Sequence, residues 1–541
     1  MALLQSVAVL IVSLCVLKAV QRRKHYSVKD IPGPRSNSYI LGHLYDLAIH
    51  PAGVLDLQWK AKYGGVVRIK GCLGEDRLLI SDPKALHYIF NVSGYGIIKQ
   101  PFRRELSRLL TGRGLIWAEG DTHRRQRKVA GPAFGAPEIK ALIPIYNKCA
   151  AQLTAKWIEL INGNQEPSVV IDFPNWLGRA TLDAIGIAGF DYDFGALNDS
   201  RNPLASAYNN ILQLTHGHPS KGRIFFQGIA SYIPMSVLGF IQDHGRSSAV
   251  VEARKVTELA NKIAQDLVAE KTKALDTAKG KRDIMSLLVE ANHNLDSRLH
   301  LNADEMYSHM RTNLLAGYET TSNTLSWAFL ELARNPSVQT HLRQEIRAHR
   351  ADIISRGGSE FTFSDYDNMP YLLAVLKENL RMNPVAHHIH RETSKDDAFP
   401  LREPLTTLSG KRITELHVPR GLKFTTSVIG YHQDPSIWGE DAGIFNPDRW
   451  LQDTAKVIPT TGVYANLLTF GSGVRACIGW RFAVAEMQAF LVELVENFEF
   501  SMTDSAEQVR RDICLVVVPV VEAEVEKGIY LPLKVSLAEP E

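Results

Sequence analysis

The amino-terminal residues form a long apolar run that a basic cluster follows. Between Ala2 and Val20 the polar residues are Gln5, Ser6, Ser13 and Lys18, and residues 21–25 read Gln-Arg-Arg-Lys-His. A membrane-spanning helix needs about 20 apolar residues, and a lysine can extend its side chain to the interface. A cleavable signal peptide would carry its positive charge ahead of the run. The pattern therefore favours an uncleaved transmembrane anchor over residues 1–21, with the remainder of the chain on the cytoplasmic side.

A basic and proline-rich segment, residues 22–36, separates this run from the remainder. It contains Ile31-Pro32-Gly33-Pro34, and proline fixes the backbone in conformations that do not continue a helix. We expect a basic stop and a stiff hinge here, followed by one large domain over residues 37–541.

The pattern beyond the hinge predicts a mainly α fold with a small β region. Two short strands are expected at Val66–Ile69 and Arg77–Ile80 around a turn, and the chain then reads as mostly helical to about Pro384. One predicted helix starts at the N-cap signature of Asn302 with Glu305 and ends at Asn335-Pro336. About thirty residues at 1.5 Å each span ~50 Å, which is enough to cross a large domain.

Composition and charge are those of an ordinary globular protein. The 541 residues are 45% hydrophobic and 22% charged, with a net charge of +3, so nothing indicates binding to nucleic acid. The five cysteines form no C-x-x-C pair and no disulfide framework, as is usual in a reducing compartment. Four of them are expected to be small buried side chains: Cys15, Cys72, Cys149 and Cys514.

The fifth cysteine, Cys477, has different surroundings. It lies in the segment Phe470-Gly471-Ser472-Gly473-Val474-Arg475-Ala476-Cys477-Ile478-Gly479, ahead of a long helical stretch. The glycines allow a tight turn close to a flat macrocycle, Arg475 can pair with a propionate, and a following helix start favours the thiolate. Phe470 can cover the ligand and exclude water. The segment indicates a loop that presents a thiolate to a haem iron.

The centre of the long predicted helix carries a second candidate motif, Ala316-Gly317-Tyr318-Glu319-Thr320-Thr321. Taken alone, it is equally a polar interruption of a buried helix in which glycine is kept for packing. Dioxygen activation beside a haem would, however, use the small Ala316 and Gly317 for space. The Thr320 hydroxyl can bond the carbonyl of Ala316, and Glu319 with Thr320 can relay protons.

Two further motifs complete a series. Glu378 and Arg381 lie three residues apart on one helix face, a spacing that usually marks a solvated surface pair. Downstream, Arg449 lies in Phe445-Asn446-Pro447-Asp448-Arg449-Trp450. With the segments around Thr320 and Cys477, and in this order, these motifs resemble cytochrome P-450 enzymes of the microsomal type. The segments at Arg449-Trp450 and 477–483 resemble fungal members.

This resemblance implies a role for each motif. Cys477 would be the axial ligand of the haem iron in haem b, and Glu378, Arg381 and Arg449 would form a buried structural cluster. His123 and Arg127 match the family's W-x-x-x-R propionate contacts, with histidine in place of tryptophan, and Arg391 falls where another propionate-binding arginine is common. His387, His388 and His390 are expected in a pocket wall and a loop surface rather than at a metal.

The implied fold is the cytochrome P-450 fold, one catalytic domain over residues 37–541 behind the anchor. The implied reaction is monooxygenation of a lipophilic organic substrate such as a terpenoid, a sterol or another secondary metabolite, with Glu319 and Thr320 as catalytic residues. Because no G-x-G-x-x-G unit indicates a nicotinamide or flavin domain, electrons would come from NADPH through a reductase. The expected location is the endoplasmic reticulum membrane, in contact with membrane lipid, with a single span and a cytoplasmic catalytic domain.

Two alternatives stay open. A haem-thiolate peroxide isomerase or dehydratase would share the cysteine loop, but it would not need the acid–alcohol pair Glu319-Thr320. A non-enzymatic haem sensor would need neither this pair nor space for dioxygen.

Two surfaces complete the expectations. Arg124, Arg125 and Lys128 face away from His123 and Arg127, as a docking patch for an acidic reductase or as an ordinary solvated face. The expected pocket walls are residues 101–117, 208–240, Thr312, Leu315, 385–388 and the terminal strands.

Overall fold

The computed structural model describes residues 27–198, 219–246, 248–275, 283–294, 299–452 and 461–539. The predicted anchor, residues 1–21, lies outside the described residues, as does the start of the predicted basic stop. Within the described ranges, no helix is both long enough and apolar enough to cross a membrane.

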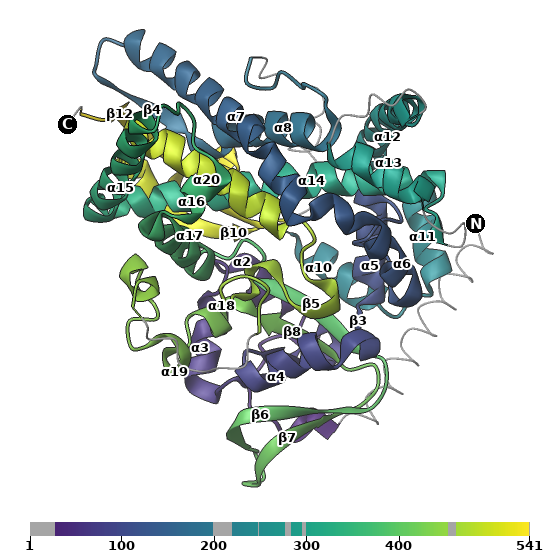
Figure 1. Ribbon diagram of the computed structural model, residues 1–541. Coiled ribbons are helices and arrows are strands. Elements are labelled where there is room, and N and C mark those ends of the chain that lie inside the picture. The colour runs from purple at the N-terminus through teal and green to yellow at the C-terminus, as the bar shows by residue number, and fades with distance from the viewer. Residues whose placement is uncertain are drawn as a thin grey trace.

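The longest described helix, α14 (Ala303–Arg334), runs through the middle of the molecule (Figure 1). Its start is fixed by a capping box, in which the Asn302 side chain accepts the N–H of Glu305 and the Glu305 carboxylate accepts the N–H of Asn302. Asn335 ends the helix because Pro336 begins the next one, α15 (Pro336–Ser355). The bounds predicted for this helix are confirmed.

The other helices surround α14. The larger ones are α5 (Pro101–Thr111), α6 (Gly120–Ala130), α7 (Ala136–Asn162), α8 (Phe173–Phe190), α10 (Lys221–Ala230), α11 (Met235–His244), α12 (Ser248–Leu275), α13 (Ile284–Asn294), α17 (Pro370–Met382) and α20 (Trp480–Asn497). Short helices link them: α2 (Leu44–Ile49), α3 (Val54–Tyr63), α4 (Pro83–His87), α16 (Phe363–Asp367), α18 (Val428–His432), α19 (Pro435–Trp438) and α21 (Asp504–Glu507).

The main sheet lies apart from most of the helices, toward the bottom of Figure 1. Its order is β1-β2-β8-β5-β3, from Val66–Lys70, Asp76–Ile80, Lys423–Ser427, His388–Thr393 and Ile97–Lys99. The predicted strand pair β1–β2 is confirmed as an antiparallel hairpin. In the pairing of β3 with β5, Lys99 lies opposite Arg391. This register brings two cations from distant parts of the chain to one edge of the sheet.

The remaining strands form small sheets among the described residues. They are β4 (Ser168–Asp172), β12 (Pro532–Leu537) and β9 (Phe498–Ser501) in one sheet, the hairpin β6 (Asp397–Thr406) with β7 (Arg412–Val418), and the hairpin β10 (Val509–Ile513) with β11 (Val517–Val521). Strands β3 and β4 interrupt the stretch that the sequence predicts to be mostly helical. Each is short and pairs with a distant strand, so its local pattern is a weak signal.

Helix α14 packs closely on α8 at Gly317. A Cβ atom at this position would lie 2.8 Å from Cγ1 of Ile185, so the glycine is needed for the contact between the two helices. Gly317 and Ile185 both line the cavity described below, so the expectation that Gly317 leaves space for dioxygen stays a prediction. Ala316, one residue earlier, is exposed and lines the cavity described below.

Candidate active site

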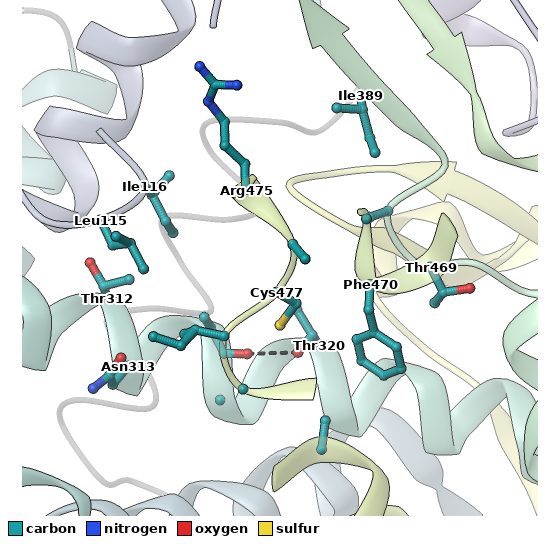
Figure 2. A pocket seen from close by; sticks show the side chains of 18 of the residues that line it. Leu115, Ile116, Thr312, Asn313, Thr320, Ile389, Thr469, Phe470, Arg475 and Cys477 are labelled. Carbon is teal, nitrogen blue, oxygen red and sulfur yellow. Dashed lines mark hydrogen bonds between the residues drawn. The ribbon is translucent and has the colours of Figure 1, made fainter. Parts of the chain in front are cut away.

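A cavity of about 530 Å³ lies between α14, the segment around Cys477 and strand β5 (Figure 2). Cys477 precedes α20, and its amide donates to the carbonyl of Phe470 at 2.8 Å. Gly471 and Gly473 turn the backbone with φ values of +65° and +63°, in the left-handed region that favours glycine. The result is an exposed Cys477 side chain that lines the cavity, with Phe470 beside it.

Two groups oppose the protonation of this thiol. Its enclosed position raises the pKa of Cys477, whereas the N–H of Gly479 and the charge of Arg127 lower it. Arg127 is held there because its Nη1 donates to the carbonyl of Ala476 at 2.6 Å. A soft metal ion would add the remaining stabilisation of a thiolate.

The lining of the cavity is strongly basic. None of the described lining residues is Asp or Glu, whereas six carry a cationic side chain: Lys99, Arg103, Arg104, Arg127, Arg391 and Arg475. Burial lowers the pKa of Lys99 to about 7 and that of Arg391 to about 10. Positive charges that are costly to bury favour an anionic ligand, and the two carboxylates of a haem are of this type.

The four residues predicted to contact the haem propionates line this same cavity. His123 and Arg127 lie on α6, and the His123 Nδ1 is 2.8 Å from the Tyr95 hydroxyl. Burial, with the nearby charges of Lys99, Arg475 and Arg127, lowers the pKa of His123 to about 3, so its ring is neutral. Such a ring can still donate one N–H to a carboxylate.

Arg475 and Arg391 reach the cavity from the cysteine segment and from β5. Arg475 Nε donates to Glu119 Oε1 at 2.9 Å, and its Nη1 donates to the carbonyl of Gly94 at 3.1 Å. Arg391 Nη1 donates to the carbonyl of His390 at 2.9 Å. The sequence offered no signal for Glu119, which lies alone before a glycine.

Lys99 is a further cation that sequence reasoning missed. Its Nζ donates to three backbone carbonyls, those of Leu115, Ile116 and Ala118, at 3.1, 2.6 and 2.8 Å. Leu115 and Ile116 line the cavity. The ammonium therefore holds this wall in place, and the short apolar strand around Lys99 gives no hint of that role.

The two residues of the predicted acid–alcohol pair lie on different sides of α14. Thr320 lines the cavity, and its hydroxyl donates to the carbonyl of Ala316 at 2.7 Å (Figure 2). Glu319 is 4% exposed, is absent from the described lining, and accepts from Asn323 Nδ2 at 3.3 Å. Burial raises the pKa of Glu319 to about 7. It is thus an acid held behind the wall that Thr320 forms.

Glu378, Arg381 and Arg449 meet in the interior. Both Glu378 and Arg381 are 0% exposed. Glu378 Oε1 accepts from Arg381 Nη2 at 2.7 Å and from Arg449 Nε at 2.9 Å, and Oε2 accepts from Arg381 Nε at 2.8 Å. The remaining N–H groups of Arg381 donate to the carbonyls of His432, Ala442 and Ile444. All five donors of this guanidinium are therefore used.

The walls of the cavity agree only in part with the sequence expectation. Residues of the 101–117 segment, Thr312, Val385, Ala386 and His388 line it, as predicted. Leu315 and His387 do not, and neither do the described residues 219–240 or the terminal strands. Leu315 is buried in the large hydrophobic core instead. Residues 208–218 lie outside the described ranges.

The predicted basic patch is also reduced. Arg125 turns to α14, where its Nη1 donates to Glu305 Oε2 at 3.1 Å and to the carbonyl of His300 at 2.7 Å. Arg124 pairs with Asp121 on the surface. A three-residue patch is therefore wrong, because Arg125 is used to connect α6 to the start of α14.

Comparisons with known proteins agree with this geometry. A sequence model described as cytochrome P450 matches residues 32–525. Cytochrome P450 monooxygenase 128 of Postia placenta is 34% identical over 525 residues, which cover 94% of this chain and 92% of the relative. Cytochrome P450 monooxygenase claO of Ampulloclitocybe clavipes is 30% identical over 519 residues, which cover 94% of this chain and 93% of the relative.

Proposed function

This chain belongs to the cytochrome P450 family of monooxygenases, and we propose that it inserts one atom of dioxygen into a lipophilic organic substrate. The observation that carries the proposal is a cysteine side chain facing a cavity whose described lining holds six cationic side chains and no Asp or Glu. When bound, haem b supplies the oxidation chemistry. The chain supplies the ligand, the cations for the haem carboxylates and the groups that move protons.

We assign the haem site as follows. Cys477 is the axial ligand of the haem iron and Phe470 covers the ligand side. His123, Arg127, Arg391 and Arg475 hold the carboxylates. The chemistry of these residues fits the group, since a cysteine sulfur and four side chains that can donate to carboxylates line one cavity, and none of its described lining residues is an acid.

Thr320 and Glu319 are proposed to deliver protons. The Thr320 hydroxyl can rotate from the Ala316 carbonyl into the cavity, because a serine or threonine bond to the preceding turn is easily exchanged. Glu319 stands behind α14 as the acid that replaces the proton. The same pair favours monooxygenation over peroxide rearrangement, which would not need protons from the chain.

The partners belong to the same proposal. Electrons come from NADPH through a cytochrome reductase, and the substrate is a secondary metabolite such as a terpenoid or a sterol. The catalytic domain spans residues 37–541 and lies on the cytoplasmic side of the endoplasmic reticulum membrane, held through residues 1–21 and hinge residues 22–36.

The proposed function has a direct spectroscopic test. The purified protein, reduced and exposed to carbon monoxide, should give the red-shifted band of a thiolate-bound haem. Reductase-dependent NADPH oxidation should then respond to added lipophilic compounds. A protein without Soret absorption, or with a band that is not shifted, would contradict the proposal.

Replacement of Thr320 by alanine is expected to uncouple electron use from product formation. The variant keeps the cavity but loses the hydroxyl, so the product formed per NADPH should fall by on the order of 10-fold or more. The measurement compares NADPH consumed, product and hydrogen peroxide. Thr272→Ala is the matched control, because Thr272 makes the same bond to the preceding turn on an exposed face of α12. Equal coupling in the Thr320 and Thr272 variants would contradict the proposed role of Thr320 in proton delivery.

Glu319 predicts a dependence on pH with a defined sign. Burial raises the pKa of Glu319 from 4.5 to about 7, so the folded chain holds a proton that the unfolded chain loses. Stability should fall as pH rises from 4.5 through about 7, and coupling should fall above pH 7 as the acid loses its proton. The titratable groups that act on or from Glu319 are the Tyr318 hydroxyl, which lowers its pKa, and the Cys514 thiol.

Glu319→Gln removes the titrating group. Its stability should lose this pH dependence, and its coupling should be low at every pH. The two readouts are unfolding curves and product per NADPH over the same pH series. A variant whose coupling still falls above pH 7 as in the parent chain would show that another group controls proton delivery.

A further inference from the structure

Arg103 differs from the other cations that line the cavity, because its guanidinium makes no hydrogen bond or ion pair with any residue that the structure describes. Arg103 lies in the first turn of α5, its side chain is exposed, and it lines the cavity. The neighbouring Arg104, by contrast, donates to the carbonyl of Trp117 at 3.0 Å and stacks on its ring. The exposed surface of Arg103 belongs to the cavity lining, and burial lowers the pKa of Arg103 to about 10.

The carboxylates on the elements around Arg103 are already engaged. Glu75 accepts from Arg77 Nε at 2.7 Å and from Lys423 Nζ at 2.8 Å. Asp56 lies 2.6 Å from His388 Nε2 and accepts from Ser427 Oγ at 2.5 Å. In the same helix, Glu105 accepts from Arg108 Nε at 2.6 Å. The charge of Arg77 repels that of Arg103, and Arg103 in turn helps to lower the pKa of His387 and His390.

Arg103 is separate from the cations proposed for the haem carboxylates. The charges that act on Arg391 are those of Arg475 and Glu119, whereas Arg103 acts on His387 and His390. Strand β5 runs from His388 to Thr393. His390 directly precedes Arg391 in this strand, and successive side chains of a strand point to opposite faces. Arg103 therefore serves a different part of the cavity.

We propose that Arg103 binds a carboxylate of the substrate, which makes the substrate class an amphiphilic organic acid. The inference rests on the proposed monooxygenase function and names the substrate class of that site. An unpaired guanidinium beside an apolar wall is a strong site for one carboxylate, because two parallel N–H groups match its two oxygens. The apolar lining near Cys477 and Thr320, with Val385, Ala386 and Ile389, then takes the hydrocarbon body. Oxidation would occur at a carbon distant from the acid group.

The test is a spectral titration of the haem-loaded protein with matched pairs of acid and methyl ester. The probes are dodecanoic acid and abietic acid, each with its methyl ester, and the readout is the spin-state shift of the Soret band. A charged hydrogen bond of this type corresponds to about 10- to 100-fold in affinity. We expect at least one acid to bind about 10-fold tighter than its ester, the preference to vanish in Arg103→Gln, and part of it to return in Arg103→Lys.

Arg108→Gln is the matched control, because Arg108 lies on the same helix but pairs with Glu105 and Asp243 and does not line the cavity. It should keep the acid preference. The proposal is overturned if both acids bind no better than their esters, or if Arg103→Gln keeps the preference. It is also overturned if Arg103→Gln loses haem, since Arg103 would then hold a haem carboxylate. A third contrary outcome is a variant that weakens only the binding of the protein to vesicles containing phosphatidylserine, since Arg103 would then contact lipid headgroups.

The result is separable from the test of the proposed function. A protein without the thiolate band with carbon monoxide contradicts the monooxygenase assignment itself. A protein with the band and with no acid preference contradicts the role of Arg103 alone.

Discussion

Replacement of Cys477 by serine is expected to abolish the carbon monoxide band of the thiolate-bound haem and to reduce product formation to background. Among the described residues that line the cavity, two contain sulfur, Cys477 and Met487. Cys477 is the thiol, and Met487 is a thioether. A serine hydroxyl keeps the size of the side chain but is a hard, neutral ligand, so it cannot replace the electron donation of a thiolate. The absorption spectrum and the product yield of the purified variant are the measurements.

Cys514→Ser is the control for this variant. Cys514 is partly buried, and it is absent from the cavity lining among the described residues. The control should keep the shifted band and turnover. If the Cys477 variant kept a shifted band, or if the Cys514 variant lost it, the assignment of the ligand would be wrong.

Replacement of Glu378 by glutamine is expected to destabilise the protein by about 3–5 kcal/mol, the usual cost of breaking a buried ion pair. Glu378 accepts five hydrogen bonds, from Arg381, Arg449, the amide of Asn446 and the indole of Trp450. A glutamine would lose the charge and would point an NH₂ group at N–H donors. Thermal unfolding of the haem-loaded variant, followed by the loss of Soret absorption, measures the change.

Glu159→Gln is the matched control for this substitution. Glu159 pairs with Lys156 on the exposed face of α7, and exposed pairs contribute about 0–1 kcal/mol. The control should unfold within a degree or two of the parent chain (about 1 kcal/mol at most). Equal unfolding temperatures for both variants would show that the buried cluster does not stabilise the fold.

Local signals made part of this molecule predictable. The start of α14 follows from a capping box and its end from a proline, each a signal of a few residues, and the β1–β2 hairpin follows from two adjacent strands. Glu378 and Arg381 are on one helix face, so their contact needs only helix geometry. Arg449 joins them across a long sequence separation, and the resemblance to a known family was needed to expect it.

The rest depends on long-range packing that a single sequence does not encode visibly. Arg125 looks like any surface arginine of α6, yet it pairs with Glu305, which lies far along the chain. Gly317 reads as space left for a ligand, and nothing near it in the sequence indicates its close contact with Ile185 of α8. Arg103 lies among other charged residues of α5 and reads as a solvated side chain. In each case the surroundings of the residue are fixed only when the helices meet.

Lys99 connects two parts of the cavity through its hydrogen bonds. Its backbone amide donates to Glu119, the carboxylate that pairs with Arg475, and its ammonium holds the carbonyls of residues 115, 116 and 118. Lys99 thus bonds both to the group that would receive the haem carboxylates and to the cavity wall that includes residues 115 and 116. A haem carboxylate that competed with Glu119 for Arg475 would therefore disturb this wall as well. The protein without haem is therefore a poor receptor for substrate screening, and candidate ligands should be tested only against the haem-loaded protein.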